Sequence, residues 1–86
     1  MDTPKIEFPC RYPIKVIGDA DEGAAGEVLA IVREHAPDLT PDDVNTRHSR
    51  KGNYMSIRVT ITAVSQSQLE RLHADLIAQP SVRLVL

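Results

Sequence analysis

The chain has 86 residues, of which 42% are hydrophobic, 26% are charged and 3% are aromatic. This size and balance fit one small folded domain, residues 1–86, and exclude a disordered or fibrous chain. The net charge of −2 argues against a nucleic-acid-binding protein. The single cysteine cannot form an internal disulfide, and no apolar run approaches the roughly 20 residues that span a bilayer. We therefore expect a cytoplasmic domain with no membrane segment.

The chain opens with a tail and a strand. Residues 1–9 contain two prolines and no clear period, so we expect a partly ordered tail that becomes ordered near Phe8. Over residues 11–17 the side chains alternate between two sides, which is typical of a strand, and Gly18 ends it. Ile17 makes the outer side partly apolar, which favours a central position in the sheet.

A helix is predicted next. Asp19 and Glu22 have the spacing of a capping box at its start, and Pro37 stops it. One apolar stripe runs between them, formed by Ala25, Val28, Leu29, Val32 and Ala36. Thr40 followed by Pro41 can then start a single helical turn.

Two strands joined by a tight turn follow. Residues 44–50 form a polar strand with little to bury, which suits a sheet edge. Residues 51–53 form the turn. Residues 54–62 alternate strictly: Met55, Ile57, Val59 and Ile61 face one way, and polar side chains face the other. This pattern predicts a strand with one buried face and one wet face.

The last two elements complete the pattern. Ser65 and Gln68 predict the start of a second helix, whose stripe is Leu69, Leu72 and Leu76. Residues 81–86 form the last strand, with Val82, Leu84 and Leu86 inward and Arg83 and Val85 outward. The order strand, helix, strand, strand, helix, strand predicts an α+β fold, the ferredoxin-like βαββαβ sandwich. Its four-stranded antiparallel sheet would carry both helices on one face.

The other sheet face is therefore predicted to be open. On this register it presents Lys15, Ile17, Tyr54, Ser56, Arg58, Thr60, Arg83 and Val85. One-sided antiparallel sheets often simply face solvent, and that interpretation stands beside contact with a partner protein or a small anionic ligand. Charge is also divided along the chain: residues 19–43 hold eight acids and one base, and residues 44–58 hold four bases and no acid.

No catalytic or metal-binding pattern is present in the sequence. The glycines after residue 17 lack the Lys and Ser/Thr of a phosphate loop. The three histidines are not spaced as a metal pair, so we expect no metal and no cofactor. Cys10 as a nucleophile would need a base and an anion hole that nothing nearby in sequence supplies. We expect a protein that is not an enzyme, with catalysis by Cys10 as the hypothesis to be excluded.

A single-stranded RNA-binding module is an alternative. RNA-recognition domains share this strand order, and their third strand carries stacking aromatics. Here Tyr54 alone could stack. Because each stacked base contributes about 1–3 kcal/mol, one aromatic in place of two or three weakens this interpretation.

Three stretches resemble the YbeD-like family of small bacterial proteins. They are Phe8-Pro9 with Tyr12 and residues 15–18, His35-Ala36-Pro37 followed by residues 49–56, and residues 82–86. The resemblance covers nearly the whole chain. It implies a ferredoxin-like fold similar to the ligand-sensing ACT regulatory domains, and a link to lipoate metabolism suggested by neighbouring genes. Arg50 and Arg58 stand where small hydroxyl residues are common in that family, which makes this chain more basic near the hairpin.

These observations lead to one functional hypothesis. We expect a non-catalytic regulatory or adaptor domain that binds a protein partner or a small anionic ligand, with a weak homodimer as a further expectation. Its predicted contact residues are Lys15, Ser49, Lys51, Tyr54, Ser56 and Arg58.

Overall fold

The structure is a computed structural model that describes residues 7–86, apart from the side chain of Glu22. Residues 1–6, most of the predicted tail, lie outside the described residues. The elements in chain order are β1 (Cys10–Asp19), α1 (Glu22–His35), a 3-10 turn (Pro41–Asp43), β2 (Val44–His48), β3 (Tyr54–Ala63), α2 (Gln66–Ala78) and β4 (Val82–Val85). Among the described residues, no helix is long and apolar enough to cross a membrane.

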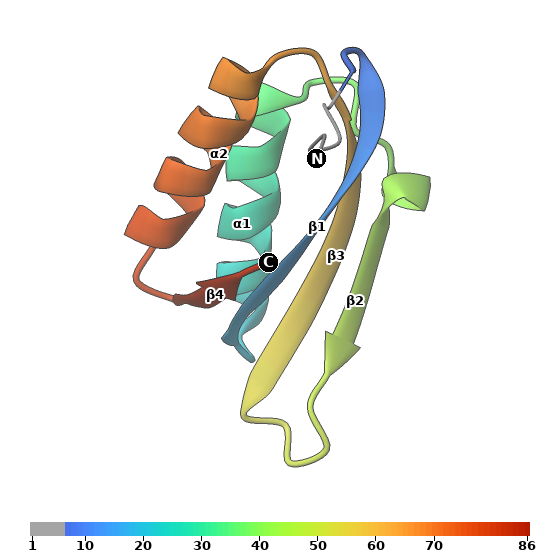
Figure 1. The fold of residues 1–86 in the computed structure, drawn as a ribbon. Helices are drawn as coiled ribbons and strands as arrows, with labels where there is room; N and C mark the ends of the chain where they lie inside the picture. The colour runs from blue at the N-terminus through green and yellow to red at the C-terminus, as the bar shows by residue number, and fades with distance from the viewer. Residues whose placement is uncertain (1–6) are drawn as a thin grey trace, which may run out of the picture.

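The four strands form one antiparallel sheet in the order β2-β3-β1-β4. β1 is central and the polar β2 lies at an edge, as their sequences predict. α1 and α2 lie side by side on one face of the sheet (Figure 1). The predicted ferredoxin-like α+β fold is thereby confirmed.

The hydrophobic core fills the space between the sheet and the helices. Met55, Ile57, Val59 and Ile61 of β3 are at most 4% exposed, and the residues between them are half-buried or exposed. Val16 of β1 and the helical residues Val28, Val32, Leu72 and Leu76 complete the cluster. Burying each such side chain contributes about 1.5–3 kcal/mol. The strict alternation of β3 therefore fixes which sheet face is covered.

The start of α1 differs from the sequence prediction. β1 continues two residues further than expected, and the Asp19 amide donates to the Ser81 carbonyl at 2.9 Å. The helix cap is Asp21, whose carboxylate accepts a hydrogen bond from the Gly23 amide at 3.0 Å. Both acids could cap a helix, and the extra strand pairing decides between them. At α2, Ser65 is the cap as predicted, and its hydroxyl accepts from the Gln68 amide at 3.1 Å.

The side chains of β4 also differ from the prediction. The register shifts between Ile17 and Gly18, so that Gly18 lies opposite Val82 while Val16 lies opposite Val85. Val82 and Val85 consequently both pack on the core. Leu84 and Leu86, predicted to point inward, are 47% and 66% exposed. The predictions that Leu84 and Leu86 point inward and that Val85 points outward were therefore wrong.

Candidate functional site

The sheet face opposite the helices is bare and slightly hollow; we call it the open face. Its concavity has a volume of about 680 Å³ and is lined by side chains from β1, β2, β3 and the two connections of β2. Five of the six predicted contact residues line it: Lys15, Ser49, Tyr54, Ser56 and Arg58. Lys51 does not, because it lies in the hairpin loop. The structure therefore brings together most of the predicted set.

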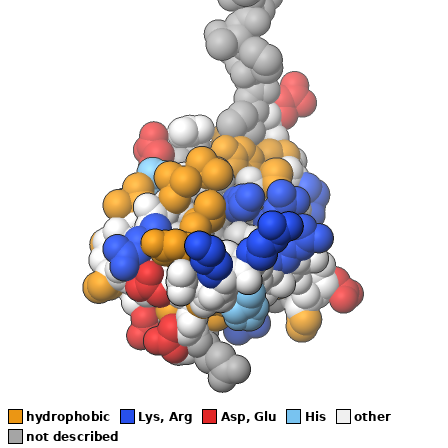
Figure 2. All heavy atoms as spheres, turned by 90° about the horizontal axis from the view of Figure 1, so that it is seen from below, with side chains coloured by type: hydrophobic (Ala, Val, Ile, Leu, Met, Phe, Trp, Pro, Cys, Tyr) orange, Lys and Arg blue, Asp and Glu red, His pale blue; other side chains and the backbone are white. Residues whose placement is uncertain are grey.

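Three cations lie close together on this face. Lys15 of β1 is directly opposite Arg58 of β3. Arg47 of β2 is opposite Ser56, which lies two residues before Arg58 on β3. Among the described residues, none of these cations forms an ion pair within 4.0 Å of a carboxylate. Like charges placed opposite each other on neighbouring strands are destabilising. We call Lys15, Arg47 and Arg58 the cation cluster. Figure 2 shows Lys and Arg side chains gathered on one side of the molecule, beside a histidine.

Arg47 was missed at the sequence level. Residues 45–48 are all polar and only Val44 is apolar, so alternation alone does not say which side chains share the face of Ser56 and Arg58. The register of the hairpin supplies that information: Asn45 lies opposite Arg58, and Arg47 lies opposite Ser56. If the length of the loop between β2 and β3 were known, counting residues back from the loop would place Arg47 on the open face.

Arg83 is less available than predicted. Its guanidinium donates to both carboxylate oxygens of Asp19, at 3.0 and 3.5 Å. The hydrogen bond and the charge of Asp19 raise the pKa of Arg83 above its usual value, so it is cationic but already paired. Tyr54 lies opposite Asp19 and is 50% exposed. The ion pair of Asp19 with Arg83 beside Tyr54 therefore leaves this cation less free to hold a nucleic-acid phosphate next to the aromatic.

Ser49 has a structural part in the hairpin. Its amide donates to the Tyr54 carbonyl at 2.8 Å, and its hydroxyl oxygen accepts from the Tyr54 amide at 3.1 Å. These bonds close a loop over residues 50–53, in which Gly52 has a φ of +74° that favours glycine. Ser49 therefore positions Tyr54, and its hydroxyl hydrogen stays free to donate.

At the other end of the concavity an acid is already neutralised. Arg11 of β1 forms an ion pair with Asp43, and the Thr40 amide donates to the same carboxylate at 3.1 Å. The hydrogen bond from the Thr40 backbone and the contact with Arg11 lower the pKa of Asp43, against partial desolvation. Asp43 thus anchors the chain before β2 and does not balance the cation cluster.

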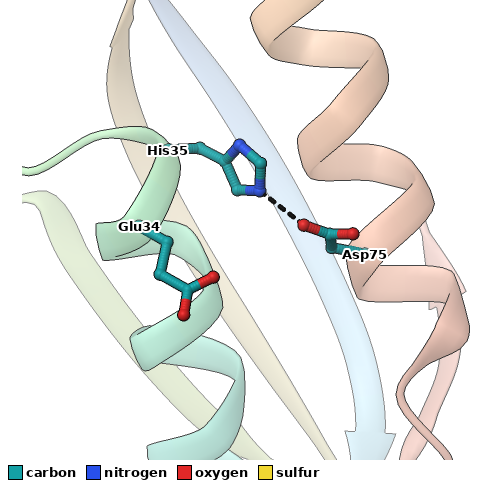
Figure 3. Close-up of side chains that lie close together, drawn as sticks. All are labelled: Glu34, His35 and Asp75. Atoms are coloured by element: carbon teal, nitrogen blue, oxygen red, sulfur yellow. Dashed lines mark hydrogen bonds and ion pairs between the residues drawn. The ribbon is translucent and has the colours of Figure 1, made fainter.

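A second group of titratable side chains lies between the helices. Glu34 and His35 at the end of α1 meet Asp75 of α2, and their potential ligand atoms lie within 4.8 Å of one another (Figure 3). The His35 Nε2 atom is 2.6 Å from the Asp75 carboxylate, and the Gln68 side-chain amide donates to the His35 carbonyl at 2.8 Å. These bonds hold α1 against α2. Because the His35 Nε2 atom and the Asp75 carboxylate are bonded to each other, we assign the group a structural role.

A smaller hollow of about 350 Å³ lies between β1 and α2. Its walls are largely apolar and include Tyr12, Ile14, Leu69 and Val85. Neither hollow is lined by Cys10, which is half-buried at the start of β1 opposite Ala63. The exclusion of catalysis by Cys10 stays a prediction.

Comparison with protein families and curated relatives gives a consistent result. The family model described as "Protein of unknown function (DUF493)" matches residues 3–86. The UPF0250 protein of Azotobacter vinelandii is 51% identical over 87 aligned positions, covering 100% of this chain and 95% of the relative. A UPF0250 protein of Pseudomonas paraeruginosa is 54% identical, covering 100% and 94%.

Solved structures with the same fold are more distant in sequence. Protein HP0495 from H. pylori superposes with a TM-score of 0.70 at 20% identity, covering 98% of this chain and 88% of that one. The ACT domain from GTP pyrophosphokinase of Chlorobium tepidum superposes with a TM-score of 0.65 at 14% identity, covering 90% and 97%. At these identities the likeness concerns the fold alone.

Proposed function

Since this chain belongs to the DUF493 family, whose function is not known, we propose from its geometry that it is a non-catalytic regulatory or adaptor domain that binds an anionic partner on its open face. The partner is an acidic protein surface or a small anionic ligand. One observation carries the proposal: Lys15, Arg47 and Arg58 lie together on a bare sheet face, with no ion-pair partner among residues 7–86. The regulatory part of the proposal also draws on the ACT-like fold of the distant relatives.

The physical reason lies in the cost of opposed charges. Lys15 and Arg58 repel each other in the free domain, so a bound anion relieves the repulsion as well as forming new contacts. The hydroxyl of Ser56, between Ile17 and Arg47 across the strands, adds a donor at the centre of the concavity. The three cations outnumber the acids Asp42 and Asp43 at the far end of the concavity, and such an excess of positive charge concentrates anions and speeds their association.

The test uses inorganic tripolyphosphate and a short poly-glutamate peptide as probes. Each is titrated into the full chain, and the backbone amides are followed by NMR. We expect shifts that map to β1, β2 and β3 around Lys15, Ser56 and Arg58, and a loss of these shifts in the double variant Lys15→Ser/Arg58→Ser.

Arg71→Ser is the matched control, because Arg71 is an exposed cation on α2 away from the open face. It should leave both titrations unchanged. Absence of open-face shifts with either probe would overturn the proposal, and so would an equal loss in the control. Single-stranded homopolymer RNA is the third probe, and Tyr54→Ser tests the RNA alternative. RNA binding should weaken in this variant if bases stack on Tyr54, and should stay unchanged if RNA binds only as an anion.

Three finer statements stay predictions that accompany this proposal. They are residence in the cytoplasm, a weak homodimer and the link to lipoate metabolism that the family resemblance implies. The proposed binding face requires none of them.

A further inference from the structure

The open face has two chemically different halves. Over β2 and β3 it carries Arg47 and Arg58, with Lys15 at the border. Over β1 and β4 it carries an apolar patch, in which Ile17 lies opposite Leu84, next to the ion pair of Arg83 with Asp19. Leu84 is 47% exposed, which is high for a large apolar side chain of this domain. The register shift in β4 creates this apolar half, because it turns Leu84 away from the core.

From this division we infer that the partner is a different protein, which presents an amphipathic helix with an acidic stripe beside an apolar one. The inference rests on the function proposed above and names the partner of the same site. A helix with its side chains is about 10–12 Å wide, and neighbouring strands are about 4.8 Å apart. A single helix therefore covers two to three strands, enough to contact both halves at once.

A small anion would complement only the cationic half of the open face. It would neutralise the cation cluster but would leave Ile17 and Leu84 facing water. Helices that bind grooves use apolar anchors at positions i, i+3, i+4 and i+7. Acidic residues next to that stripe would reach the cation cluster, so one ligand would complement both halves.

The unpaired start of β1 fits a partner strand less well than the open face fits a helix. β4 and Leu86 pair with residues 15–18 of β1, and among the described residues nothing pairs with the same side of β1 before Lys15. The amides of Lys15 and Asp19 point to that side. The backbone nitrogen of Pro13 faces the same side of β1 but carries no hydrogen, so a strand added next to it would lack one hydrogen-bond donor.

A second copy of this chain does not supply the required helix. The apolar stripes of α1 and α2 are buried in their own core through Val28, Val32, Leu72 and Leu76. A symmetric contact between two open faces would place cations against cations or against apolar side chains. A head-to-tail contact would offer acids of α1 to the cation cluster but no exposed apolar stripe to Ile17 and Leu84. A partner that is not this chain therefore fits both halves better.

The decisive experiment compares two peptides of identical composition, each about 18 residues or five turns long. In the striped peptide leucines occupy one face with glutamates beside them; in the scrambled peptide the leucines are spread around the helix. Tripolyphosphate is titrated in parallel. By calorimetry on the full chain we expect the striped peptide to bind at least about tenfold more tightly than the scrambled one.

Single substitutions separate the contributions that the two halves of the open face make to binding. Leu84→Ser should weaken striped-peptide binding several-fold and leave tripolyphosphate binding unchanged, and Ile17→Thr should do the same if Leu84→Ser folds poorly. Arg58→Ser should weaken both ligands. Ile77→Ser is the matched control, since Ile77 is 57% exposed on α2, outside the open face, and should change neither.

The outcomes separate this inference from the broader proposal. Equal affinity for the two peptides, with shifts on the open face, overturns the amphipathic helix and leaves anion binding intact. No binding of either peptide or of tripolyphosphate overturns both. Binding of the striped peptide at the hollow between β1 and α2, read from amide shifts, also overturns the inference.

Discussion

The two faces of strand β3 differ in what they contribute: one stabilises the fold and the other carries the candidate contact residues. Met55, Ile57, Val59 and Ile61 point to the helices and are almost fully buried, whereas Ser56 and Arg58 between them point to the bare side. The covered side supplies the apolar burial that holds the fold together. The open side keeps two cations opposite each other, which slightly destabilises the fold. Stability and contact chemistry are thus separated by the two-residue period of one strand.

The largest expected effect tests this separation within two neighbouring residues. Ile57→Ala should lower the free energy of unfolding by about 2–5 kcal/mol, because it removes buried volume from the core. Arg58→Ala, on the opposite side, should change it by at most about 0.5 kcal/mol. Urea denaturation followed by circular dichroism measures both. Similar losses in the two variants would contradict the division between the faces.

The next effect concerns Gly18, at the register shift between β1 and β4. A Cβ atom there would lie 2.7 Å from the Ser81 carbonyl oxygen, so Gly18→Ala must displace backbone. We expect a loss of about 1–3 kcal/mol, the usual range for overpacking. Gly26→Ala is the control: it lies on α1 with nothing within 4 Å of the added atom. That substitution should stabilise the helix by up to about 1 kcal/mol. An unchanged free energy of unfolding in Gly18→Ala would show that β4 can move away to make room for the added Cβ atom.

A smaller effect should have opposite signs for folding and for binding. Lys15→Glu replaces a like-charge pair across β1 and β3 with an opposite-charge pair, which should stabilise the fold by about 0.2–1 kcal/mol. The same change should abolish tripolyphosphate binding. Lys15→Gln should fall between wild type and Lys15→Glu in both measurements. If Lys15→Glu lowers the melting temperature, the two side chains do not interact as described.

The smallest effect depends on pH. The pKa of Asp43 is lowered in the folded chain, so its contacts stabilise the fold above the ordinary aspartate value of 3.8. That contribution is lost as the pH falls below this value toward the lowered pKa. Asp43→Asn should therefore lower the melting temperature at neutral pH, and its difference from wild type should shrink in acid. A difference that is constant with pH would show that the contacts of the ionised Asp43 carboxylate with the Thr40 amide and Arg11 do not stabilise the fold.

How far the sequence predicts this molecule depends on whether a signal is local. The alternation of residues 54–62 identifies β3, and with it the covered and open faces, because the period of a strand is a local property. The cap at Ser65 is equally local. Asp19 and Asp21 are both adequate caps, however, and the choice between them is made by pairing with β4, which lies more than 60 residues away.

The same limit explains the errors at the site. Four of the five residues in 82–86 are apolar, so their pattern allows either phase, and a register shift set by β1 decides it. Arg47 joins the cation cluster only through the register of the hairpin. His35 and Asp75 are 40 positions apart in sequence, and nothing near either residue indicates the other. Tertiary pairing supplies what local patterns lack.

The opposition of Lys15 and Arg58 also has a consequence for the choice of buffer. Dissolved ions screen charges over about 10 Å at 0.1 M and about 3 Å at 1 M. Added sodium chloride should therefore narrow the difference in melting temperature between wild type and Lys15→Gln, while it loosens any complex held by the same cations. Conditions that look most favourable in a thermal-shift screen would then be the least suited to isolating the partner.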